Sequence, residues 1–207
     1  MPHAAPTGFS MSDPGNAMER MVAALRGGQG RGLPPVERWN PDFCGDIDMR
    51  IAADGTWFYL GTPIGRLALV KLFSSVLRRD GDDYVLVTPV EKLGIVVEDA
   101  PFQAVEMAVE GEGDGRSIAF RTHVDDLVAV GPEHAIRFER EAHDGLKPYI
   151  HVRRGLWARV TRALTYDLLA LGEVRDVDGV SMFGIAVAGG FYPAVPASEI
   201  EGETERS

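Results

Sequence analysis

Cysteine is almost missing from this chain of 207 residues, since Cys44 is the only one. A single thiol excludes an internal disulfide and is typical of a reducing compartment. No apolar run approaches the roughly 18 residues that a membrane span needs. Neither Lys nor Arg precedes Arg20, and no apolar stretch follows the first residues as in a secretory signal. We therefore expect a cytoplasmic protein with no membrane partner.

Basic residues are in the minority: 21 Lys and Arg stand against 31 Asp and Glu, a formal net charge of -10. Such a surface repels nucleic-acid phosphates and anionic lipids, which predicts that neither is a partner. A small anionic ligand remains compatible with this charge if the arginines cluster locally.

The sequence also lacks the motifs that are typical of common catalytic and metal-binding sites. The sequence has no phosphate-binding P-loop, no nucleophile elbow, no HExxH and no CxxC. Its five histidines show no metal-ligand spacing. Asp46 and Asp48 share one face of an expected strand, which we interpret as a solvated face and not as a metal or acid-base site. We expect no cofactor and no metal, and we favour a non-catalytic protein over an enzyme.

Composition and periodicity divide the chain into four parts. Residues 1–37 read as a flexible segment containing a short amphipathic helix, because Met18, Met21, Val22 and Leu25 follow helical spacing. Residues 38–99 and 100–195 read as two folded lobes, and 196–207 as a disordered acidic tail. The fold class we predict is α+β, with two related lobes, each a curved, mostly antiparallel sheet with one main helix.

The first lobe is expected to begin with a strand through Ile47 and Ile51, then an Asp54-Gly55 turn and a return strand from Trp57. A helix from Arg66 to Arg79 and two more strands complete it. The second lobe is expected to contain a Gly-rich hairpin at 111–115, an Asp144-Gly145 turn, a strand Tyr149–Arg153, a helix Leu156–Leu171 and a last strand Val180–Val187.

The two lobes also match at a fixed offset of 90 residues. Over positions 54–70 about one identity is expected from residue frequencies. The identical pairs are Asp54 and Asp144, Gly55 and Gly145, Tyr59 and Tyr149, Gly65 and Gly155, Ala68 and Ala158, and Val70 and Val160. We interpret this as a duplication; the alternative is that hairpin-plus-helix units simply share turn residues. Ligand sites often lie between such lobes.

Arginines mark two equivalent corners of these lobes. Arg66 stands at the first predicted helix start, where Thr62 could cap, and Arg153 and Arg154 stand at the second. A cation at a helix N-terminus is unfavourable unless an anion stands between them. We therefore predict that these arginines bind negative groups, with salt bridges to the many acidic residues as the alternative.

Further candidate ligand-binding residues are Arg121 and His123, which share a strand face, together with His151. Trp57 and Tyr149 could stack on a ring, although core packing is the commoner role for such side chains.

Several long segments resemble the bacterial family called domain of unknown function 1285. They are Gly45–Ile51, Asp54–Trp57, Gly61–Arg66, Leu72–Arg79, Tyr84–Glu91, Ala100–Phe102 and Pro148–Gly155. The resemblance spans roughly Pro34–Pro193. It implies a duplicated α+β architecture whose second domain is similar to pleckstrin-homology-like folds. It also implies a site at the domain interface for a nucleotide-like ligand, and a role in signalling.

These observations favour a non-catalytic sensor of a small anionic ligand, which the resemblance implies is nucleotide-like, with a signalling protein as partner. One alternative is a protein-interaction adaptor that docks through the N-terminal helix and the Pro34–Pro41 strap. The other is a metal-dependent hydrolase using Asp46, Asp48 and His151. The ligand and the oligomeric state are not predicted by the sequence.

Overall fold

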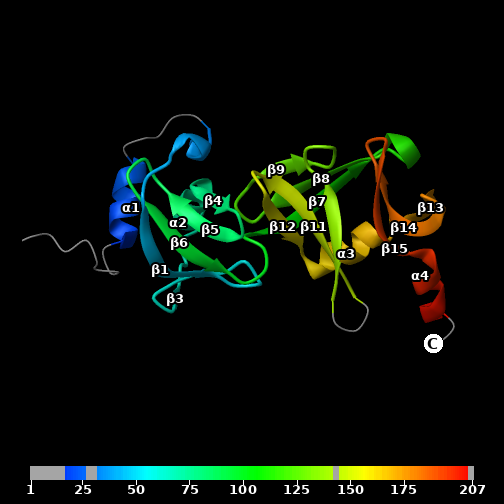
Figure 1. The fold of residues 1–207 in the computed structure, drawn as a ribbon. Helices are drawn as coiled ribbons and strands as arrows, with labels where there is room; N and C mark the ends of the chain where they lie inside the picture. Colours follow the sequence, from blue (N-terminus) through cyan, green and yellow to red (C-terminus); the bar gives the residue numbers. More distant parts are fainter. Residues whose placement is uncertain (1–16, 27–31, 142–144, 205–207) are drawn as a thin grey trace, which may run out of the picture. The chain divides into compact units, whose positions relative to one another are not determined.

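The computed structural model describes residues 17–26, 32–141 and 145–204. Its chain forms two compact units (Figure 1). The first comprises residues up to Arg50 and Phe58–Val96, and the second comprises Ile51–Trp57 and everything from Val97 onward. Each unit is built around a six-stranded sheet, so the α+β class with two similar sheets and one main helix each is confirmed.

The sheet of the first unit has the strand order β3-β2-β1-β6-β5-β4. Its strands are β1 (Phe43–Ile51), β2 (Trp57–Tyr59), β3 (Thr62–Pro63), β4 (Leu77–Asp80), β5 (Asp83–Val87) and β6 (Lys92–Val97). Helix α2 (Leu67–Ser75) connects β3 to β4 and buries Val70 and Phe73. The N-terminal helix α1 (Ala17–Arg26) also belongs to this unit.

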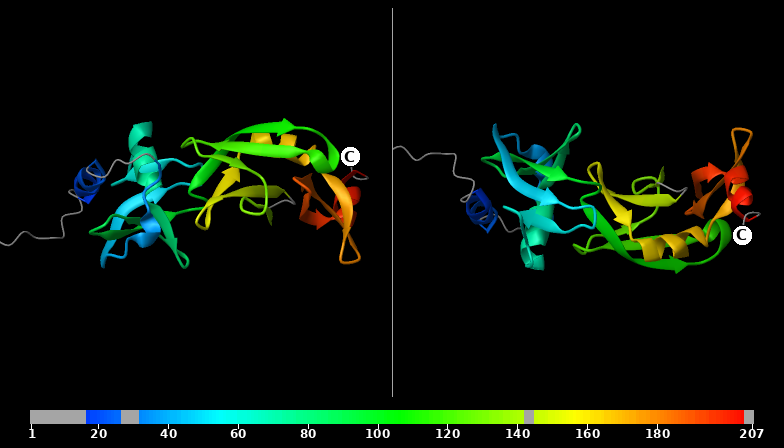
Figure 2. Two further views of the ribbon diagram at one scale, coloured as in Figure 1. Left: turned by 90° about the horizontal axis from the view of Figure 1, so that it is seen from above. Right: turned by 90° about the horizontal axis from the view of Figure 1, so that it is seen from below.

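The sheet of the second unit has the order β10-β11-β12-β7-β8-β9. Its strands are β7 (Phe102–Glu110), β8 (Ser117–Thr122), β9 (Leu127–Ala129), β10 (Ile136–Arg140), β11 (Leu146–Arg153) and β12 (Leu156–Val160). The short 3-10 turn η3 (Gly113–Gly115) joins β7 to β8, and helix α3 (Arg162–Leu169) follows β12. Figure 2 shows α3 along this sheet, where it contacts β7 and β11.

The duplication appears in the strand order of the two sheets. In reverse, the order of the second sheet is β9-β8-β7-β12-β11-β10. If the strands of each sheet are numbered one to six along the chain, both sheets have the order three, two, one, six, five, four. The helix does not follow this rule, because α2 precedes the fourth strand and α3 follows the sixth.

The 90-residue register predicted for the repeat is therefore not a register of equivalent elements. It pairs Ala68 and Val70 of helix α2 with Ala158 and Val160 of strand β12. The shared turn residues that suggested it lie in hairpins and loops of different topological position. The identities at this offset therefore reflect shared turn residues. The domain duplication itself is supported by the common strand order.

Both predicted helices are shorter than expected, for a physical reason. Helix α2 ends at Ser75, where the hydroxyls of Ser74 and Ser75 donate to carbonyls of the last turn. The chain then turns into β4, which pairs with β5. In the second unit, Leu156–Val160 alternates buried and half-buried side chains, the two-residue period of a strand. Thr161 begins the helix instead of Leu156.

The turns were predicted well where the chain is described. Gly55 has φ +84°, and its N–H donates to Ala52 O at 2.9 Å, as the Asp54-Gly55 hairpin requires. The hairpin at 111–115 is present. Asp144 lies outside the described residues, although the N–H of Glu141 donates to Gly145 O at 2.7 Å and closes the β10–β11 connection.

The C-terminal part holds a third sheet that the sequence did not predict. Strands β13 (Glu173–Val177), β14 (Val180–Val187) and β15 (Gly190–Pro196) form it, in that order, by antiparallel pairing. Helix α4 (Ala197–Thr204) then occupies the segment expected to be a disordered tail. Burial of Val195 and Ala197 ties the end of β15 and the start of α4 to the fold.

In the described ranges no helix is long and apolar enough to cross a membrane. The likeness of the second unit to pleckstrin-homology folds stays a prediction.

Candidate functional site

The nine residues predicted to bind a ligand fall on several different elements. Thr62 and Arg66 belong to the first unit. There Thr62, in β3, pairs with Tyr59 of β2. Thr62 therefore does not cap α2. Arg66 is exposed and occupies the N-cap position of that helix with no side-chain cap bond. The other seven belong to the second unit.

The second predicted corner does not contain a helix N-terminus. Arg154 and Gly155 have φ values of +52° and +72° and form the two-residue turn between β11 and β12, in which Arg153 pairs with Leu156. Positive φ at both central residues matches the right-handed twist of a hairpin. The helix dipole that we invoked to explain Arg153 and Arg154 is therefore absent from this corner.

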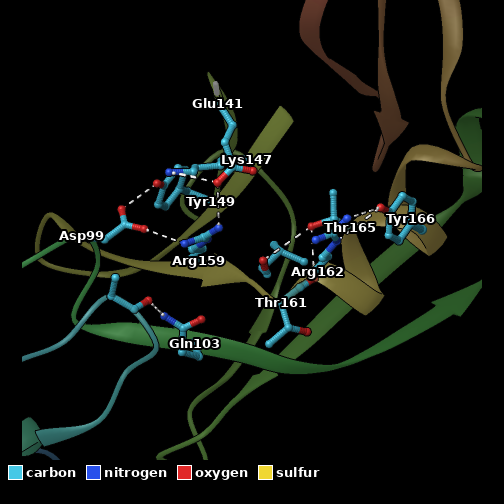
Figure 3. A network of polar contacts seen from close by, with 12 residues as sticks. Asp99, Gln103, Glu141, Lys147, Tyr149, Arg159, Thr161, Arg162, Thr165 and Tyr166 are labelled. Carbon is cyan, nitrogen blue, oxygen red and sulfur yellow. Dashed lines mark hydrogen bonds and ion pairs between the residues drawn. The ribbon is translucent and has the colours of Figure 1, made fainter. Parts of the chain in front are cut away.

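Trp57 and Tyr149 are core residues, because each side chain is only 1% exposed. The Tyr149 hydroxyl donates to Asp99 Oδ1 at 2.6 Å, and Arg159 Nη1 lies 3.2 Å from Asp99 Oδ2 (Figure 3). Burial, and then the hydrogen bond to the Asp99 carboxylate, raises the pKa of the Tyr149 phenol. The group is a neutral structural donor at neutral pH, and stacking on a ligand was the wrong prediction for both rings.

A network of charges extends from Tyr149 along the same face of the sheet (Figure 3). Glu141 Oε1 lies 3.4 Å from both Lys147 Nζ and Arg159 Nη2. The guanidinium of Arg137 covers the rings of Tyr149 and Trp157, at 5.0 and 4.4 Å from their centroids. Arg137, Lys147 and Arg159 are thus each engaged by neighbouring side chains.

His151 is held by its two ring nitrogens. Nδ1 lies 2.6 Å from Glu133 O, and the N–H of Gly155 donates to Nε2 at 3.1 Å. The ring also packs edge-on against Trp157. His151 thus fixes the hairpin turn that carries Arg154.

Arg121 is bound by two carboxylates on the exposed side of β8. Its Nε lies 2.7 Å from Glu106 Oε2, and its Nη1 lies 2.7 Å from Asp125 Oδ1. The hydrogen bonds to Glu106 and Asp125 raise the pKa of Arg121. Ion pairing, the alternative that we weighed for the arginines, is what the structure has here.

The structure does bring His123 and Arg153 together, around the ring of Phe102. The Arg153 guanidinium lies 4.7 Å from the Phe102 centroid, and the His123 ring centroid lies 6.4 Å from it. Arg153 Nη1 is hydrogen-bonded to Asp126 Oδ2, in an ion pair whose side chains are only 11% and 20% exposed. We call Phe102, His123, Asp126 and Arg153 the Phe102 corner.

The β8–β9 turn positions two of these residues. Thr122 Oγ1 accepts the N–H groups of Val124 and Asp126, and the N–H of Thr122 donates to Asp126 O. Asp125 has φ +68° within this turn. The two consecutive aspartates therefore bind different arginines. Asp125 accepts a hydrogen bond from Arg121, and Asp126 accepts one from Arg153.

His123 is the polar side chain of this corner with an open hydrogen-bonding position. The N–H of Gln103 donates to its Nδ1 at 3.1 Å. Its Nε2 is buried and has no hydrogen-bond partner among the residues that the structure describes. Burial lowers the pKa of His123, against the smaller opposing effects of Gln103 and Asp126. At neutral pH the ring is therefore an uncharged donor through Nε2.

The nearby Arg154 is half-buried, and burial lowers the pKa of its guanidinium. Sequence reasoning missed Phe102 and Asp126, which complete the corner. The Asp125-Asp126 pair two residues after His123 was the available signal, since a turn of acidic residues close to a basic strand favours ion pairing.

Several elements required by the two alternative functions, His151 apart, are engaged within the first unit. Met21 of α1 is 1% exposed, and the carbonyls of Val36 and Trp39 in the strap accept hydrogen bonds from Arg78. Asp46 packs over Gly94, where an added Cβ would meet its carboxylate at 2.0 Å. Within the described ranges, no three His, Cys, Asp or Glu side chains are grouped to hold a metal.

Two family descriptions match adjoining parts of the chain. "Domain of unknown function (DUF1285), N-terminal domain" matches residues 34–100, and "Protein of unknown function (DUF1285), C-terminal domain" matches 101–194. The chain belongs to the DUF1285 family. This confirms the resemblance carried by the segments quoted above.

Solved structures of DUF1285 proteins resemble this one. A DUF1285 family protein from Silicibacter pomeroyi DSS-3 is 48% identical with a TM-score of 0.80, over 87% of this chain and 97% of that one. Another, from Shewanella baltica OS155, is 30% identical with a TM-score of 0.47, over 59% of this chain and 91% of that one. No curated protein matches this DUF1285 chain.

Proposed function

We propose that this DUF1285 protein is a non-catalytic sensor that binds a small anionic ligand at the Phe102 corner. The observation that carries the proposal is that a mostly buried cation, Arg153, and the Nε2 of His123 lie near the same aromatic ring, and that this Nε2 has no hydrogen-bond partner among the described residues. Both groups donate hydrogen bonds, and a ligand with several anionic oxygens could accept from both.

The guanidinium of Arg153 suits this role because it lies over the Phe102 ring while its Nη1 donates to the Asp126 carboxylate. Guanidinium groups bind the planar oxygens of carboxylates and phosphates in the same fork geometry. Asp126 thus occupies the position of a ligand oxyanion. We infer that the ligand competes with Asp126 for Arg153, and that movement of the β8–β9 turn is the signal that a partner protein reads.

Phosphorylated metabolites, including nucleotides, are the ligand class that we propose first. The single cysteine supports a cytoplasmic location, where such metabolites are abundant.

A thermal-shift screen at constant ionic strength tests the proposal, with phosphate, pyrophosphate, nucleotides and phosphorylated metabolites as probes. A ligand that binds only the native state at 100 times its Kd adds about 2.7 kcal/mol of stability. Such a gain raises Tm by several degrees. The shift should disappear in Arg153→Met and persist in the control Arg140→Met, whose exposed side chain pairs with Glu199. A shift that survives in Arg153→Met, or no shift across the panel, contradicts the proposal.

A second variant keeps the test informative if Arg153→Met does not fold. Asp126→Asn leaves Arg153 without this carboxylate and should lower stability, since a buried charge loses its counter-ion. Added phosphate or pyrophosphate should restore more stability to Asp126→Asn than to the wild type. Equal effects of these anions and of chloride on both proteins would instead show that Arg153 is only structural.

A further inference from the structure

His123 is joined to β7 by a reciprocal pair of hydrogen bonds. Its own N–H donates to Gln103 O at 2.9 Å, and the N–H of Gln103 donates to its Nδ1 at 3.1 Å. Because Nδ1 accepts, the proton of the neutral ring is on Nε2. Protonation of the ring would place an N–H at Nδ1 opposite the N–H of Gln103, which breaks the second bond.

The charges that face this ring are few. Asp126 on the same turn acts on it electrostatically, and Arg153 from β11 covers the Phe102 ring that His123 also contacts. Strand β7 contributes Phe102 and Gln103, which carry no charge. On the strand and turn of His123 itself, Arg121 and Asp125 pair with each other on the exposed side of β8. Asp126 thus favours the imidazolium and Arg153 opposes it.

An anion bound at Arg153 changes this balance in one direction. It neutralises the guanidinium, places additional negative charge beside the ring, and offers an acceptor to Nε2. Each effect stabilises the charged imidazolium relative to the neutral ring. Burial keeps the ring neutral before the anion arrives, and its unprotonated Nδ1 accepts the N–H of Gln103.

We propose that anion binding at Arg153 is coupled to protonation of His123, so that the Phe102 corner binds its ligand more tightly as the pH falls through the range in which histidine titrates. This inference rests on the proposed function, and it adds the regulation of the same site. Linkage requires that a ligand which stabilises the protonated form also binds the protonated form more tightly. The corner then reports the ligand and the pH together.

Sulfate is the probe for the test, because its own charge is constant between about pH 5.5 and about pH 7.5, the range in which histidine titrates. Calorimetric titrations of the full chain in two buffers of different ionisation enthalpy measure protons taken up per sulfate. Affinity should rise by about tenfold for each unit by which sulfate raises the pKa of His123. Proton uptake should accompany binding near the middle of the range.

The matched control is His123→Asn, whose side-chain oxygen can still accept the N–H of Gln103 but cannot take up a proton. It should bind sulfate with an affinity that does not change with pH and without proton uptake. If both proteins bind sulfate with the same pH dependence, the coupling is overturned while the proposed function stands. If the wild-type protein binds sulfate nowhere in this pH range, and the ligand screen also gives no hit, the proposed function is overturned.

A measurement on the wild type covers the case in which His123→Asn does not fold. The ring proton signal of His123, followed by NMR against pH with and without sulfate, gives its pKa in both states. A rise in that pKa with sulfate is expected. An unchanged pKa in the presence of bound sulfate overturns the coupling.

Discussion

His123 and Gln103 exchange two hydrogen bonds, N–H to carbonyl at 2.9 Å and N–H to imidazole Nδ1 at 3.1 Å. The second bond exists only while His123 is neutral, and burial lowers the pKa of the ring in the folded protein. The unfolded chain therefore binds a proton more readily than the native one. The stability that His123 contributes is complete above about pH 6.5 and decreases as the pH falls.

This relationship predicts the acid dependence of unfolding without any ligand. The free energy of unfolding of the wild type should fall between about pH 7 and about pH 5.5, by about 1.4 kcal/mol per unit of pKa difference at most. Urea denaturation at several pH values measures it. His123→Asn should show a flatter profile over this interval, because its side chain cannot take up a proton. Parallel profiles for wild type and His123→Asn would contradict the assignment.

The Tyr149–Asp99 pair predicts a second pH effect, at the alkaline end. Tyr149→Phe should lower the free energy of unfolding by about 1 to 2 kcal/mol, because Asp99 loses a buried donor. The folded-state pKa of Tyr149 is raised, so its stabilisation is complete below about pH 10 and lost as the pH rises further. Alkaline denaturation of wild type and Tyr149→Phe should therefore converge at high pH. As a comparison, Tyr166→Phe removes the hydroxyl of an exposed tyrosine and should change stability little.

Glycine at position 55 is predicted to be needed for two separate reasons. Gly55 has φ +84°, and an added Cβ would lie 2.6 Å from Gln103 Cγ. Gly81 has φ +66° but nothing within 4 Å of the same position. Gly81→Ala should thus cost about 1 kcal/mol for the backbone alone, and Gly55→Ala should cost more, about 2 to 3 kcal/mol, because Gln103 must also move. Denaturant midpoints measure both, and equal losses would show that the Gln103 side chain yields freely.

Arg78 is predicted to anchor the proline strap to β4. Its Nη1 donates to Val36 O at 2.9 Å and to Trp39 O at 2.7 Å, while Nε and Nη2 bind both oxygens of Asp80. Arg78→Ala should lower the free energy of unfolding by about 2 to 4 kcal/mol, since the part-buried carbonyls of Val36 and Trp39 lose a charged donor and Asp80 loses its bidentate partner. Arg79→Ala, at the next and more exposed position, should cost less than about 1 kcal/mol.

The same residue gives that region its acid sensitivity. The hydrogen bond from Arg78 lowers the pKa of Asp80, so the stability this pair provides is present above the ordinary pKa of the carboxyl and is lost as the pH falls below it. A Trp39 fluorescence change that precedes global acid unfolding would report release of the strap. In Arg78→Ala, the same titration should show no separate fluorescence change before global unfolding.

How far the sequence could be interpreted depended on whether a feature is local. The Asp54-Gly55 turn, the hairpin at 111–115 and helix α1 were predicted because positive φ and helical spacing are properties of a few adjacent residues. Leu156–Val160 was predicted as a helix and is a strand, because five residues fit either period and parallel pairing with β7 decides between them.

The candidate site was only partly predictable for the same reason. His123 and Arg153 were chosen from the sequence as basic residues, but thirty positions separate them and only the sheet brings both to Phe102. Trp57 and Tyr149 were chosen as stacking rings, and their burial removes them from that role. Side-chain exposure depends on every neighbouring strand, so no local pattern reveals it.

The sequence by itself determined the α+β class, the family, the acidic surface and the turns, because each follows from composition or from residues close along the chain. The tertiary structure alone decided which charges meet: Asp125 neutralises Arg121, Asp126 neutralises Arg153, and His123 keeps one buried donor without a partner in the part of the chain that the structure describes. Ion pairs and burial are set by distances across strands, and those distances exist only once the sheets have formed.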